Sequence, residues 1–520
     1  MNLKPIQILW VDDEVDLLKP HILFLLDKGY EVTPCNNGLE AIEIIDLHNF
    51  QAVLLDENMP GLDGLETLAL IKGKLPSLPV IMVTKNEEEH IMEDAIGSKI
   101  SDYLIKPVNP NQILLSLKKN LLHRDLIAEK TTRNYQQEFR KISLELMDLK
   151  SFSDWEKFYK KMVHWELQLE TLVDPGMIEI FESQIKEANN LFSKFIAAEY
   201  EGWMLDPVSA PELSHTVFKN KIKPLLKGTQ PTLLLVIDNL RMDQWKTIEP
   251  ILLDFYTKDS EESYYSILPT ATQYARNALF SGLTPLEIAT EFPKWWKNDS
   301  EEGGKNLFEK ELLEQQLKKL RVDGKTSYHK ITNLKSGKLL SKSLNNHKKE
   351  KLTAVVYNFV DMISHAKSEM EIIKELASDN KAYRSLTASW FKNSPLLEIL
   401  LEAKKLNFQL IITTDHGTIN VDQAVEVVGD KHTSSNLRYK TGRSLTYPSS
   451  KVYEVSSPKS IGLPQTSINN KYIFALNYNY FVYPQNYNHF ATLFNNSYQH
   501  GGISMEEVII PFVVLQPKIN

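Results

Sequence analysis

Residues 52–56 read AVLLD, a short apolar run that ends in a carboxylate. Similar apolar runs stand before and after it, and amphipathic stretches such as residues 40–46 and 112–121 separate them. The other runs are IQILWV (6–11), EVTPC (31–35), LPVIMVT (78–84) and DYLIKP (102–107). Strand-like runs that alternate with helical ones are typical of a parallel sheet with helices on both faces. We therefore predict a doubly wound α/β domain over residues 1–122.

The rest of the chain predicts two further domains. Residues 124–203 lack strand-like runs, and their apolar residues recur at three- and four-residue spacing, which predicts a helical bundle connector or a dimerising stalk over residues 123–208. Strand-like runs return in residues 209–520, which predicts a second, larger α/β domain. Its clearest strands are TLLLVIDN (232–239), AVVYNFVDM (354–362) and QLIITTDHG (409–417). Residues 294–351 are rich in Lys, Asn and Gly, which indicates a solvated insertion or, alternatively, a lid over the substrate.

Composition excludes several classes of protein. The formal net charge of −8 over 520 residues provides no general basic field for nucleic acid or an anionic membrane. Cys35 is the only cysteine, so an internal disulfide, a cysteine-rich zinc cluster and a cysteine-bound iron–sulfur site are excluded. No apolar run approaches about 18 residues, and the first residues do not resemble a signal peptide. We expect a cytoplasmic protein without membrane insertion.

Polar residues follow the predicted strands of the first domain. They are Asp12, Asp13, Asp56, Thr84 and Lys106. The carboxyl ends of parallel strands meet at one edge of a sheet, so these groups should converge. Three adjacent carboxylates favour a bound Mg²⁺, with Asp56 as phosphoryl acceptor and with Lys106 and Thr84 contacting phosphoryl oxygens. Taken singly, each Asp is better explained as a helix cap or a solvated loop residue, and only the joint pattern favours the site.

Three predicted strands of the larger domain also end in metal-binding residue types. They deliver Asp238, Asp361 and the pair Asp415–His416 to one sheet edge, while His365 follows Asp361 by four residues and His500 lies in a glycine-flanked turn. This mixed nitrogen and oxygen set suits two Zn²⁺ ions, with Mn²⁺ as the other candidate. Thr272 stands at an apparent helix start, and coordination would activate its hydroxyl as a nucleophile. A helix N-cap is the plain alternative for Thr272 alone.

Other residues are candidates for substrate contacts. Arg276 and Asn277 lie one helical turn beyond Thr272 and could touch phosphate oxygens or lie on the surface. The stretch GDKHTSSNLRYKTGR (429–443) carries Lys431, His432, Arg438, Lys440 and Arg443 around Tyr439. Such a loop could follow the phosphates of an oligonucleotide, and an ordinary solvated loop explains it equally well.

Residues 1–122 closely resemble the receiver domain of two-component response regulators. The matching pieces are the pair Asp12–Asp13, Asp56 within LLDENMPGLDG, Thr84, and Lys106–Pro107. The resemblance implies that the backbone carbonyl of Asn58 binds the Mg²⁺ and that Tyr103 rotates when Thr84 moves toward the phosphoryl group. We expect that phosphorylation of Asp56 shifts an existing equilibrium of the helical face toward a dimerising form. Lys85 departs from the small residue that is usual after the threonine.

Residues 210–517 resemble the PglZ-like branch of the alkaline phosphatase superfamily. The matching pieces are VIDN, PTATQYARNALFSGLTP, VDMISH, TTDHG and HGGISMEE. The resemblance implies one zinc ion on Asp361, His365 and His500. It implies a second ion on the group Asp238, Thr272, Asp415 and His416. Thr270 is the competing nucleophile, and Thr272 is favoured because family members with a PTxT run use the second threonine. The lack of a securely placed monoester-gripping arginine favours phosphodiesters.

The order of receiver, helical connector and PglZ-like domain resembles the PorX-type response regulators of Bacteroidetes, which control type IX secretion and gliding. That resemblance implies a sensor histidine kinase, the secretion-motor protein PorL and an extracytoplasmic-function (ECF) sigma factor as partners, and zinc-dependent phosphodiesterase activity on nucleotides. The alternative is a phosphorylation-dependent adaptor with a non-catalytic metal domain. A DNA-binding regulator is disfavoured, because the charge is acidic and no recognition helix is evident.

Overall fold

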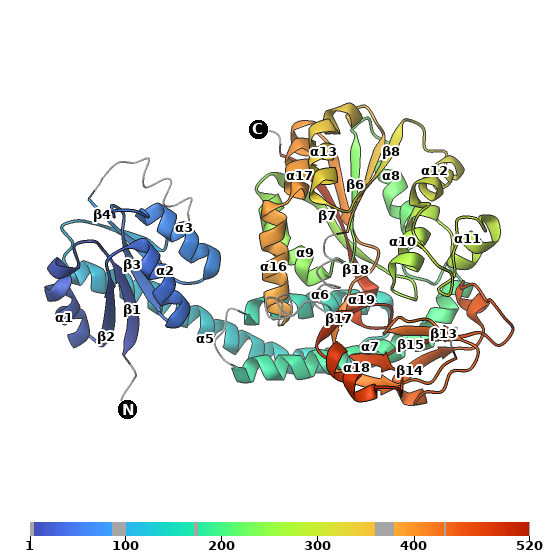
Figure 1. Cartoon of the computed structure of the whole chain (residues 1–520), viewed down its shortest axis with the longest axis horizontal. Helices are drawn as coiled ribbons and strands as arrows, with labels where there is room; N and C mark the ends of the chain where they lie inside the picture. Colours follow the sequence, from blue (N-terminus) through green and yellow to red (C-terminus); the bar gives the residue numbers. More distant parts are fainter. Residues whose placement is uncertain (1–4, 86–99, 171–174, 359–378, 431–432, 519–520) are drawn as a thin grey trace. The chain divides into compact units, whose positions relative to one another are not determined.

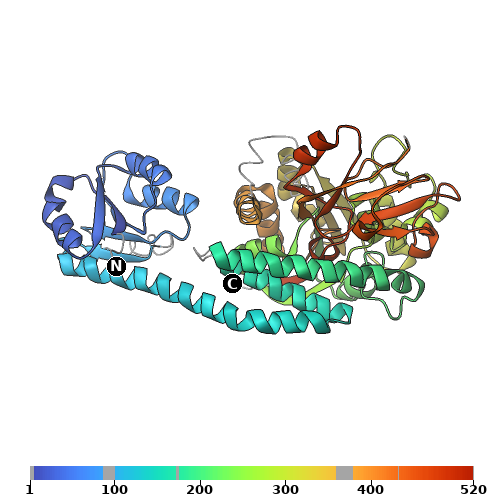
Figure 2. The ribbon, with the colours of Figure 1, turned by 90° about the horizontal axis from the view of Figure 1, so that it is seen from below.

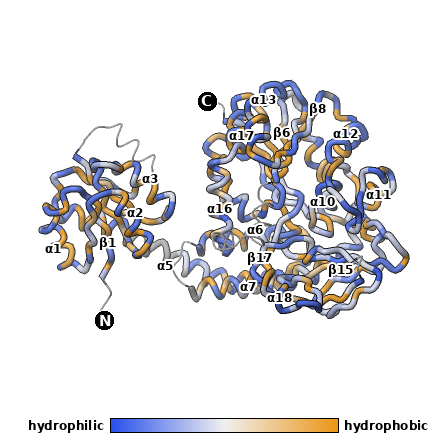
Figure 3. The backbone as a smooth tube through the Cα atoms, in the orientation of Figure 1, coloured by the Kyte–Doolittle hydropathy of each residue, from blue (hydrophilic) through white to orange (hydrophobic). Residues whose placement is uncertain are grey.

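The computed structural model describes residues 5–85, 100–170, 175–358, 379–430 and 433–518. The chain divides into two compact units, one made largely of residues 1–140 and the other largely of residues 141–520. Each unit has its own central sheet (Figures 1 and 2). In both units most residues of the central strands are buried, and hydrophobic and hydrophilic residues alternate along the helices (Figure 3).

The first unit holds a five-stranded parallel sheet in the order β2-β1-β3-β4-β5. The strands are β1 (Ile6–Val11), β2 (Tyr30–Cys35), β3 (Ala52–Asp56), β4 (Val80–Thr84) and β5 (Asp102–Ile105), and the helices are α1 (Lys19–Asp27), α2 (Gly38–Leu47) and α3 (Gly64–Lys74), with the start of α5 (Pro110–Asp148). Alternate residues of β1 enter different cores: Leu9 packs with residues of α2 and α3, and Ile8 packs with residues of α1 and α5. Both faces are therefore covered, and the predicted doubly wound fold is confirmed.

Three helices form the connector: α5, α6 (Phe152–Leu169) and α7 (Pro175–Leu205). The helix α5 continues through residue 122, where the sequence suggested a domain boundary. Near its end it contacts both partners, because Glu145 pairs with Lys161 of α6 and Ser143 accepts a hydrogen bond of 2.9 Å from Gln184 of α7. The connector is thus helical, as predicted.

The helices α6 and α7 pack onto the larger α/β domain and lie in the same compact unit. The hydroxyl of Tyr265 donates to the carbonyl of Phe152, at 3.0 Å, and Arg384 pairs with Glu166 of α6 at 2.7 Å. These contacts make the two helices part of the domain's surface layer rather than a separate stalk.

The larger domain is built on a six-stranded sheet in the order β7-β18-β10-β6-β9-β8. Its strands are β6 (Thr232–Ile237), β7 (Tyr256–Tyr265), β8 (Thr326–Ile331), β9 (Leu352–Tyr357), β10 (Gln409–Thr413) and β18 (Ile509–Pro517). The strands β10, β6, β9 and β8 are mutually parallel, so their carboxyl ends share one edge. Its longer helices are α9 (Met242–Leu253), α10 (Thr272–Ser281), α11 (Pro285–Glu291), α12 (Glu309–Lys319), α13 (Leu334–Ser343), α16 (Asn380–Asn393), α17 (Pro395–Lys405) and α18 (Tyr487–Phe494).

Much of segment 294–351 is regular secondary structure and not a solvated insertion, so that prediction was wrong. It contains α12, the edge strand β8 and α13, and β8 pairs in parallel with β9 from Thr326 to Ile331. The strand reads TSYHKI and is only partly buried, because an edge strand has one neighbour and one open side. Its polar composition concealed it among the surrounding Lys and Asn residues.

Small sheets complete the domain and bring distant segments to the strand ends. They pair β11 (Ile419–Val421) with β17 (Ser497–Gln499), β12 (Gln423–Glu426) with β16 (Asn479–Val482), and β15 (Lys471–Ala475) with both β13 (Tyr439–Gly442) and β14 (Val452–Val455). Ile419 lies opposite Gln499 in the antiparallel pair. This register carries His500 to the neighbourhood of His416.

Among the helices that the structure describes, none is both long enough and apolar enough to cross a membrane.

Candidate functional site

The three predicted acids of the first unit come together at the carboxyl edge of its sheet. Asp12 follows β1, Asp56 ends β3, and a carboxylate oxygen from each of Asp12, Asp13 and Asp56 lies within 4.8 Å of the others. Asp12 and Asp56 are buried, and Asp13 is exposed. Hard oxygen donors in such a cluster fit Mg²⁺, which usually keeps several water ligands and so suits a site with one open side.

Lys106 closes this acidic pocket from the end of β5. Its Nζ lies 2.9 Å from an oxygen of Asp12 and 2.9 Å from an oxygen of Asp56. Burial raises the pKa of Asp56, and Lys106 opposes that rise. Burial alone would lower the pKa of Lys106, but hydrogen bonds to the two carboxylates raise it above its ordinary value. The ammonium group is therefore charged and already placed beside Asp56.

Thr84 ends β4, and its hydroxyl forms a hydrogen bond with Glu57, a residue that was not predicted from the sequence. The hydroxyl donates to the carboxylate of Glu57, which directly follows Asp56. Both residues are buried. A threonine hydroxyl has a single proton, so it cannot donate to Glu57 and to a phosphoryl oxygen at once.

The remaining predicted switch residues lie around this pocket. Tyr103 is 38% exposed on β5, and Asn58 is an exposed residue just past β3. Lys85, the departure from the family pattern, pairs with Glu14 at 3.3 Å. A hollow of about 440 Å³ adjoins the pocket; its lining includes Trp10, Asp12, Leu18, His21, Lys106 and Pro107.

In the larger domain, Asp238, Asp415 and His416 form a second group of residues that could hold a metal ion. Asp238 follows β6, while Asp415 and His416 follow the neighbouring strand β10. One ligand atom from each lies within 4.8 Å of the others, and all three side chains are at most 1% exposed. Gly417 comes next, and a Cβ there would collide with the carbonyl oxygen of Glu506, so only glycine fits this turn.

The polar atoms of this group are arranged for a cation. The Nδ1 of His416 lies 3.0 Å from the carbonyl oxygen of Gly417, which places the ring proton on Nδ1 and leaves the Nε2 lone pair facing the carboxylates. Within the described part of the chain, Oδ2 of Asp415 is buried without a hydrogen-bond donor. Nη1 of Arg276 lies 3.6 Å from this oxygen and offsets part of its charge. The mixed N and O set of the group fits Zn²⁺ or Mn²⁺.

Thr272 lies against this group, as predicted for the nucleophile. Its Oγ1 is 3.0 Å from Nε2 of His416 and 3.4 Å from Oδ1 of Asp238. The competing residue, Thr270, is fully buried; its hydroxyl donates to the carbonyl of Gly502 at 2.9 Å and accepts from the amide of Gly501 at 3.0 Å. Of the two threonines, Thr272 therefore has its hydroxyl in the group of metal-binding residues.

The second predicted set of zinc ligands is Asp361, His365 and His500, and the described residues include His500 alone of the three. Its ring stacks on that of His416, with 4.4 Å between the ring centres, and its Nδ1 lies 3.2 Å from the carbonyl oxygen of Thr270. Asp361 and His365 lie outside the described residues. The arrangement thus brings a fourth imidazole or carboxylate donor, His500, next to the three residues of the first group.

The two candidate phosphate contacts on α10 are buried, not on the surface. Nη1 of Arg276 lies 2.6 Å from Oδ2 of Asp238, and its Nε donates to Glu309 at 2.5 Å. The amide nitrogen of Asn277 donates to the carbonyls of Gln273, at 2.8 Å, and Lys305, at 3.2 Å. The described contacts of both side chains are therefore to the protein itself.

The cationic residues of the predicted basic loop do not form one exposed surface, because Arg438 and Lys440 are buried. Arg438 is fully buried, and its guanidinium pairs with Glu507 at 2.6 Å, so its assignment to a substrate phosphate is corrected to a core ion pair. Burial lowers the pKa of Lys440 to about 8, and its Nζ donates to the carbonyl of Ser434 at 2.8 Å. Arg443 is exposed. Lys431 and His432 lie outside the described residues.

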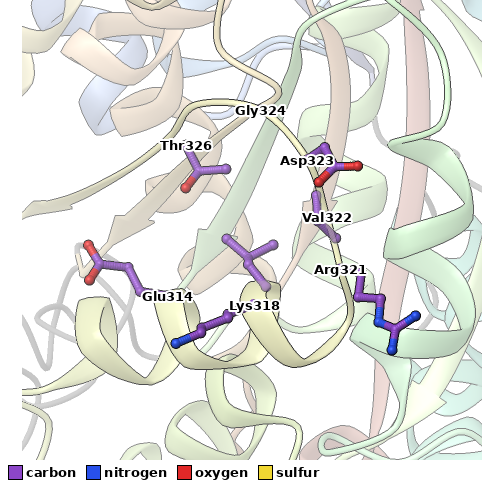
Figure 4. A pocket seen from close by; sticks show the side chains of 8 residues that line it. Glu314, Lys318, Arg321, Val322, Asp323, Gly324 and Thr326 are labelled. Atoms are coloured by element: carbon purple, nitrogen blue, oxygen red, sulfur yellow. The ribbon is translucent and has the colours of Figure 1, made fainter.

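A further hollow, of about 570 Å³, lies where α12 turns into β8 (Figure 4). Glu314 and Asp323 line it together with Lys318 and Arg321, so its charges are mixed. It adjoins the amino end of β8, whereas the metal-binding residues follow the carboxyl ends of the strands parallel to β8. This hollow is therefore separate from the candidate metal centre.

Comparisons with known families match the chain in three consecutive segments. Residues 8–118 match the response regulator receiver domain, residues 125–204 match the PorX response regulator linker domain, and residues 217–515 match the BREX system PglZ alkaline phosphatase-like domain. The last of these covers more than half of the 520 residues.

The chain is also similar to individual regulatory proteins over about a quarter of its length. The chain is 34% identical over 139 residues to the transcriptional regulatory protein ZraR of Klebsiella oxytoca, which covers 27% of this chain and 31% of that protein. It is 33% identical over 130 residues to the probable transcriptional regulator ycf29 of Pyropia yezoensis, covering 25% of this chain and 58% of that protein. The chain thus spans between about a third and somewhat over half of the length of these relatives.

Among solved structures, a CheY-like receiver domain protein from Methanospirillum hungatei is 28% identical and has a TM-score of 0.22; the match covers 23% of this chain and 95% of that one.

The three segment matches agree with the two metal-binding groups and the helical connector described above. The chain belongs to the PglZ alkaline phosphatase-like family and, with a receiver and a PorX linker ahead of that domain, is a PorX-type response regulator.

Proposed function

We propose that phosphorylation of Asp56 controls dimerisation of this regulator and the activity of a zinc-dependent phosphodiesterase in its PglZ domain. The observation that carries the enzymatic part is the position of the Thr272 hydroxyl, 3.0 Å from His416 and 3.4 Å from Asp238 in a buried group of metal-binding residues. A binding platform has no evident need for a hydroxyl at that position.

The proposed reaction uses Thr272 as nucleophile. Bound zinc would lower the pKa of the hydroxyl and offset negative charge on the phosphate oxygens. The oxygen of Thr272 attacks phosphorus in line, the bond to the leaving alcohol breaks, and water then hydrolyses the phosphothreonine. Thr272 is the first residue of α10, so the helix N-terminus also favours the negative charge that gathers there.

A phosphodiester, from a nucleotide or an oligonucleotide, is the proposed substrate. Two buried arginines of the domain, Arg276 and Arg438, donate to protein carboxylates. Gripping the extra charge of a monoester dianion calls for a cation that is free to bind it, so a diester with its single charge fits the described residues better. Arg443 is exposed and remains a candidate contact for a long substrate.

Metal removal tests the enzymatic proposal on the full chain. Treatment with a chelator should abolish hydrolysis of a chromogenic phosphodiester, and added Zn²⁺ should restore it, because the nucleophile depends on the bound cation. Mn²⁺ is the second metal to try. Hydrolysis that survives complete metal removal, or a preference for the matching monoester, would contradict the proposal.

In the receiver, we propose that Mg²⁺ binds Asp12, Asp13, Asp56 and the carbonyl of Asn58. A receiver domain implies a partner histidine kinase, and a cytoplasmic location is proposed because receiver domains are typically cytoplasmic. Control of type IX secretion and gliding, with PorL and an ECF sigma factor as partners, rests on the linker match alone. After phosphorylation, Thr84 donates to the phosphoryl group and Tyr103 rotates inward.

The contact between Thr84 and Glu57 opposes that rearrangement, so Glu57→Gln should strengthen binding of the phosphoryl analogue beryllofluoride about fivefold. A neutral amide accepts a hydrogen bond less strongly than a carboxylate, by about 1 kcal/mol, and removal of the negative charge favours the anion further. Titration in the presence of Mg²⁺ measures the affinity. Glu43→Gln makes the same change at an exposed position and should leave it unchanged. Equal affinities in both variants would show that Glu57 does not restrain Thr84.

A further inference from the structure

Arg276 occupies an unusual place for a residue of a phosphate-processing site. It lies on α10 one turn beyond Thr272 and is 1% exposed. Its Nη1 is 2.6 Å from Oδ2 of Asp238 and 3.6 Å from Oδ2 of Asp415. The guanidinium therefore bridges the two carboxylates that belong to the candidate metal centre.

This bridge gives the two oxygens of Asp238 different surroundings. Oδ2 faces Arg276, whereas Oδ1 faces the hydroxyl of Thr272, at 3.4 Å, and Nε2 of His416, at 3.9 Å. We propose that Arg276 is a positioning residue of the metal centre: it holds Asp238 so that only Oδ1 is offered to the cation and to the nucleophile. The inference rests on the proposed metal-dependent function.

The other side of Arg276 is anchored by the segment 294–351. Its Nε donates to Oε1 of Glu309, at the start of α12, at 2.5 Å. Oε2 of Glu309 accepts from Lys330 of β8, at 2.9 Å, and from the hydroxyl of Tyr328. Burial alone would raise the pKa of Glu309, but Arg276 and Lys330 lower it below its usual range. A charged anchor thus fixes the guanidinium in one orientation.

The charges of this cluster explain why an arginine is useful there. Three carboxylates, of Asp238, Asp415 and Glu309, face the two cations Arg276 and Lys330, so the cluster carries a formal charge of −1 before metal binding. One divalent ion would turn this into +1, which attracts a phosphodiester anion. Without Arg276, the buried carboxylates would repel one another and lose their fixed orientation.

Lysine cannot replace this arginine. A guanidinium donates from Nε and Nη1 in a rigid plane and so reaches Glu309 and Asp238 together, whereas an ammonium group is a single point charge. Residues that orient metal ligands typically affect metal affinity or activity by about 10–100-fold. Arg276→Lys should therefore weaken the binding of one zinc equivalent by about 10–100-fold.

The experiment is a zinc titration of the metal-free full chain in competition with a chromophoric chelator. Arg384→Lys is the matched control, because Arg384 is also a buried arginine that pairs with carboxylates, Asp243 at 2.5 Å and Glu166 at 2.7 Å. It should lower thermal stability as Arg276→Lys does and leave zinc affinity unchanged. Equal losses of zinc affinity in Arg276→Lys and Arg384→Lys would show that general destabilisation of the domain causes the effect, and this would overturn the inference.

Two further measurements separate this role from others. Glu309→Gln touches no proposed zinc ligand, yet it removes the negative charge of the anchor and should weaken zinc binding severalfold even if Arg276→Lys does not fold. Wild-type affinity in this variant would overturn the inference. At saturating zinc, KM for a small phosphodiester should return to the wild-type value in Arg276→Lys, and a KM that stays raised would assign Arg276 to the substrate instead.

These outcomes also distinguish the inference from the proposed function. Zinc affinity is measured without substrate, so a protein that binds zinc through this geometry but hydrolyses no phosphodiester would refute the enzyme and retain the role of Arg276. If the wild type hydrolyses phosphodiesters and zinc affinity is unchanged in Arg276→Lys and Glu309→Gln, the proposed enzyme is retained and the role of Arg276 is refuted.

Discussion

Thr272→Ala should abolish phosphodiester hydrolysis, with a fall in kcat/KM of about a thousandfold or more, while zinc content stays close to that of the wild type. Removal of a nucleophile eliminates the covalent route, and what remains is catalysis by charge and binding alone. The metal is retained because Asp238, Asp415 and His416 keep their positions. Steady-state kinetics and elemental analysis of the purified chain measure the two quantities.

Two companion variants make this result specific to the hydroxyl. Thr272→Ser keeps an oxygen at the same place and should retain measurable turnover. Thr270→Ser preserves the hydroxyl that bonds to Gly501 and Gly502 and should stay near wild type. Normal turnover in Thr272→Ala would reject the assignment, and loss of turnover only when Thr270 is replaced by alanine would transfer the role to that residue.

The same variant separates the enzyme from the adaptor alternative. An adaptor whose metal domain is a rigid platform should tolerate loss of the Thr272 hydroxyl in a secretion or transcription assay. A phosphodiesterase whose product matters to the cell should not. Intact zinc content in Thr272→Ala is what allows this comparison, because the platform itself remains assembled.

Asp56→Ala should eliminate the shift from monomer to dimer that a small phosphodonor such as acetyl phosphate induces in the wild-type protein. Asp56 ends β3, is 3% exposed and lies 2.9 Å from Nζ of Lys106, which fits its proposed role as the acceptor. Alanine removes the proposed site of the acyl phosphate, and Lys106 keeps Asp12 as its partner. Sedimentation velocity with and without donor and Mg²⁺ measures the assembly.

Asp27→Ala is the control for this experiment, because Asp27 is an exposed carboxylate at the end of α1. It should dimerise with donor as the wild type does. Donor-dependent dimerisation that persists in Asp56→Ala would remove Asp56 from the mechanism. A wild-type protein that takes up phosphate without changing its assembly would instead refute the coupling between phosphorylation and dimerisation.

Contacts link α7 of the connector with the neighbourhood of the candidate metal centre. Asn189 of α7 donates to the carboxylate of Glu506, at 3.0 Å, and burial raises the pKa of Glu506 to about 7. The carbonyl of Glu506 lies against Gly417, next to His416. A displacement of α7 would therefore reach a metal-binding residue through two contacts.

The candidate sites of both α/β domains could be predicted from the sequence, because several of their residues end or directly follow buried strands. A run such as TLLLVI must lie in the core, and in a parallel sheet the residue after it must lie at the common carboxyl edge, which is why Asp56, Asp238 and Asp415 were found without any structure. The same logic failed for β8, whose polar, half-exposed edge position carries no apolar signal.

The sequence by itself therefore determined the order of the domains, the two α/β sheets and the residues at the sheet edges. These features follow from apolar periodicity and from the ends of strands, which are local properties of the chain. The tertiary structure alone decided how those residues are used. It turned Arg276 and Arg438 from candidate substrate contacts into buried ion pairs, separated Thr272 from Thr270, and joined Glu57 to Thr84. A side chain's partner depends on which distant segments fold against it, and no local spacing records the approach of Glu309 to Arg276 or of Glu507 to Arg438.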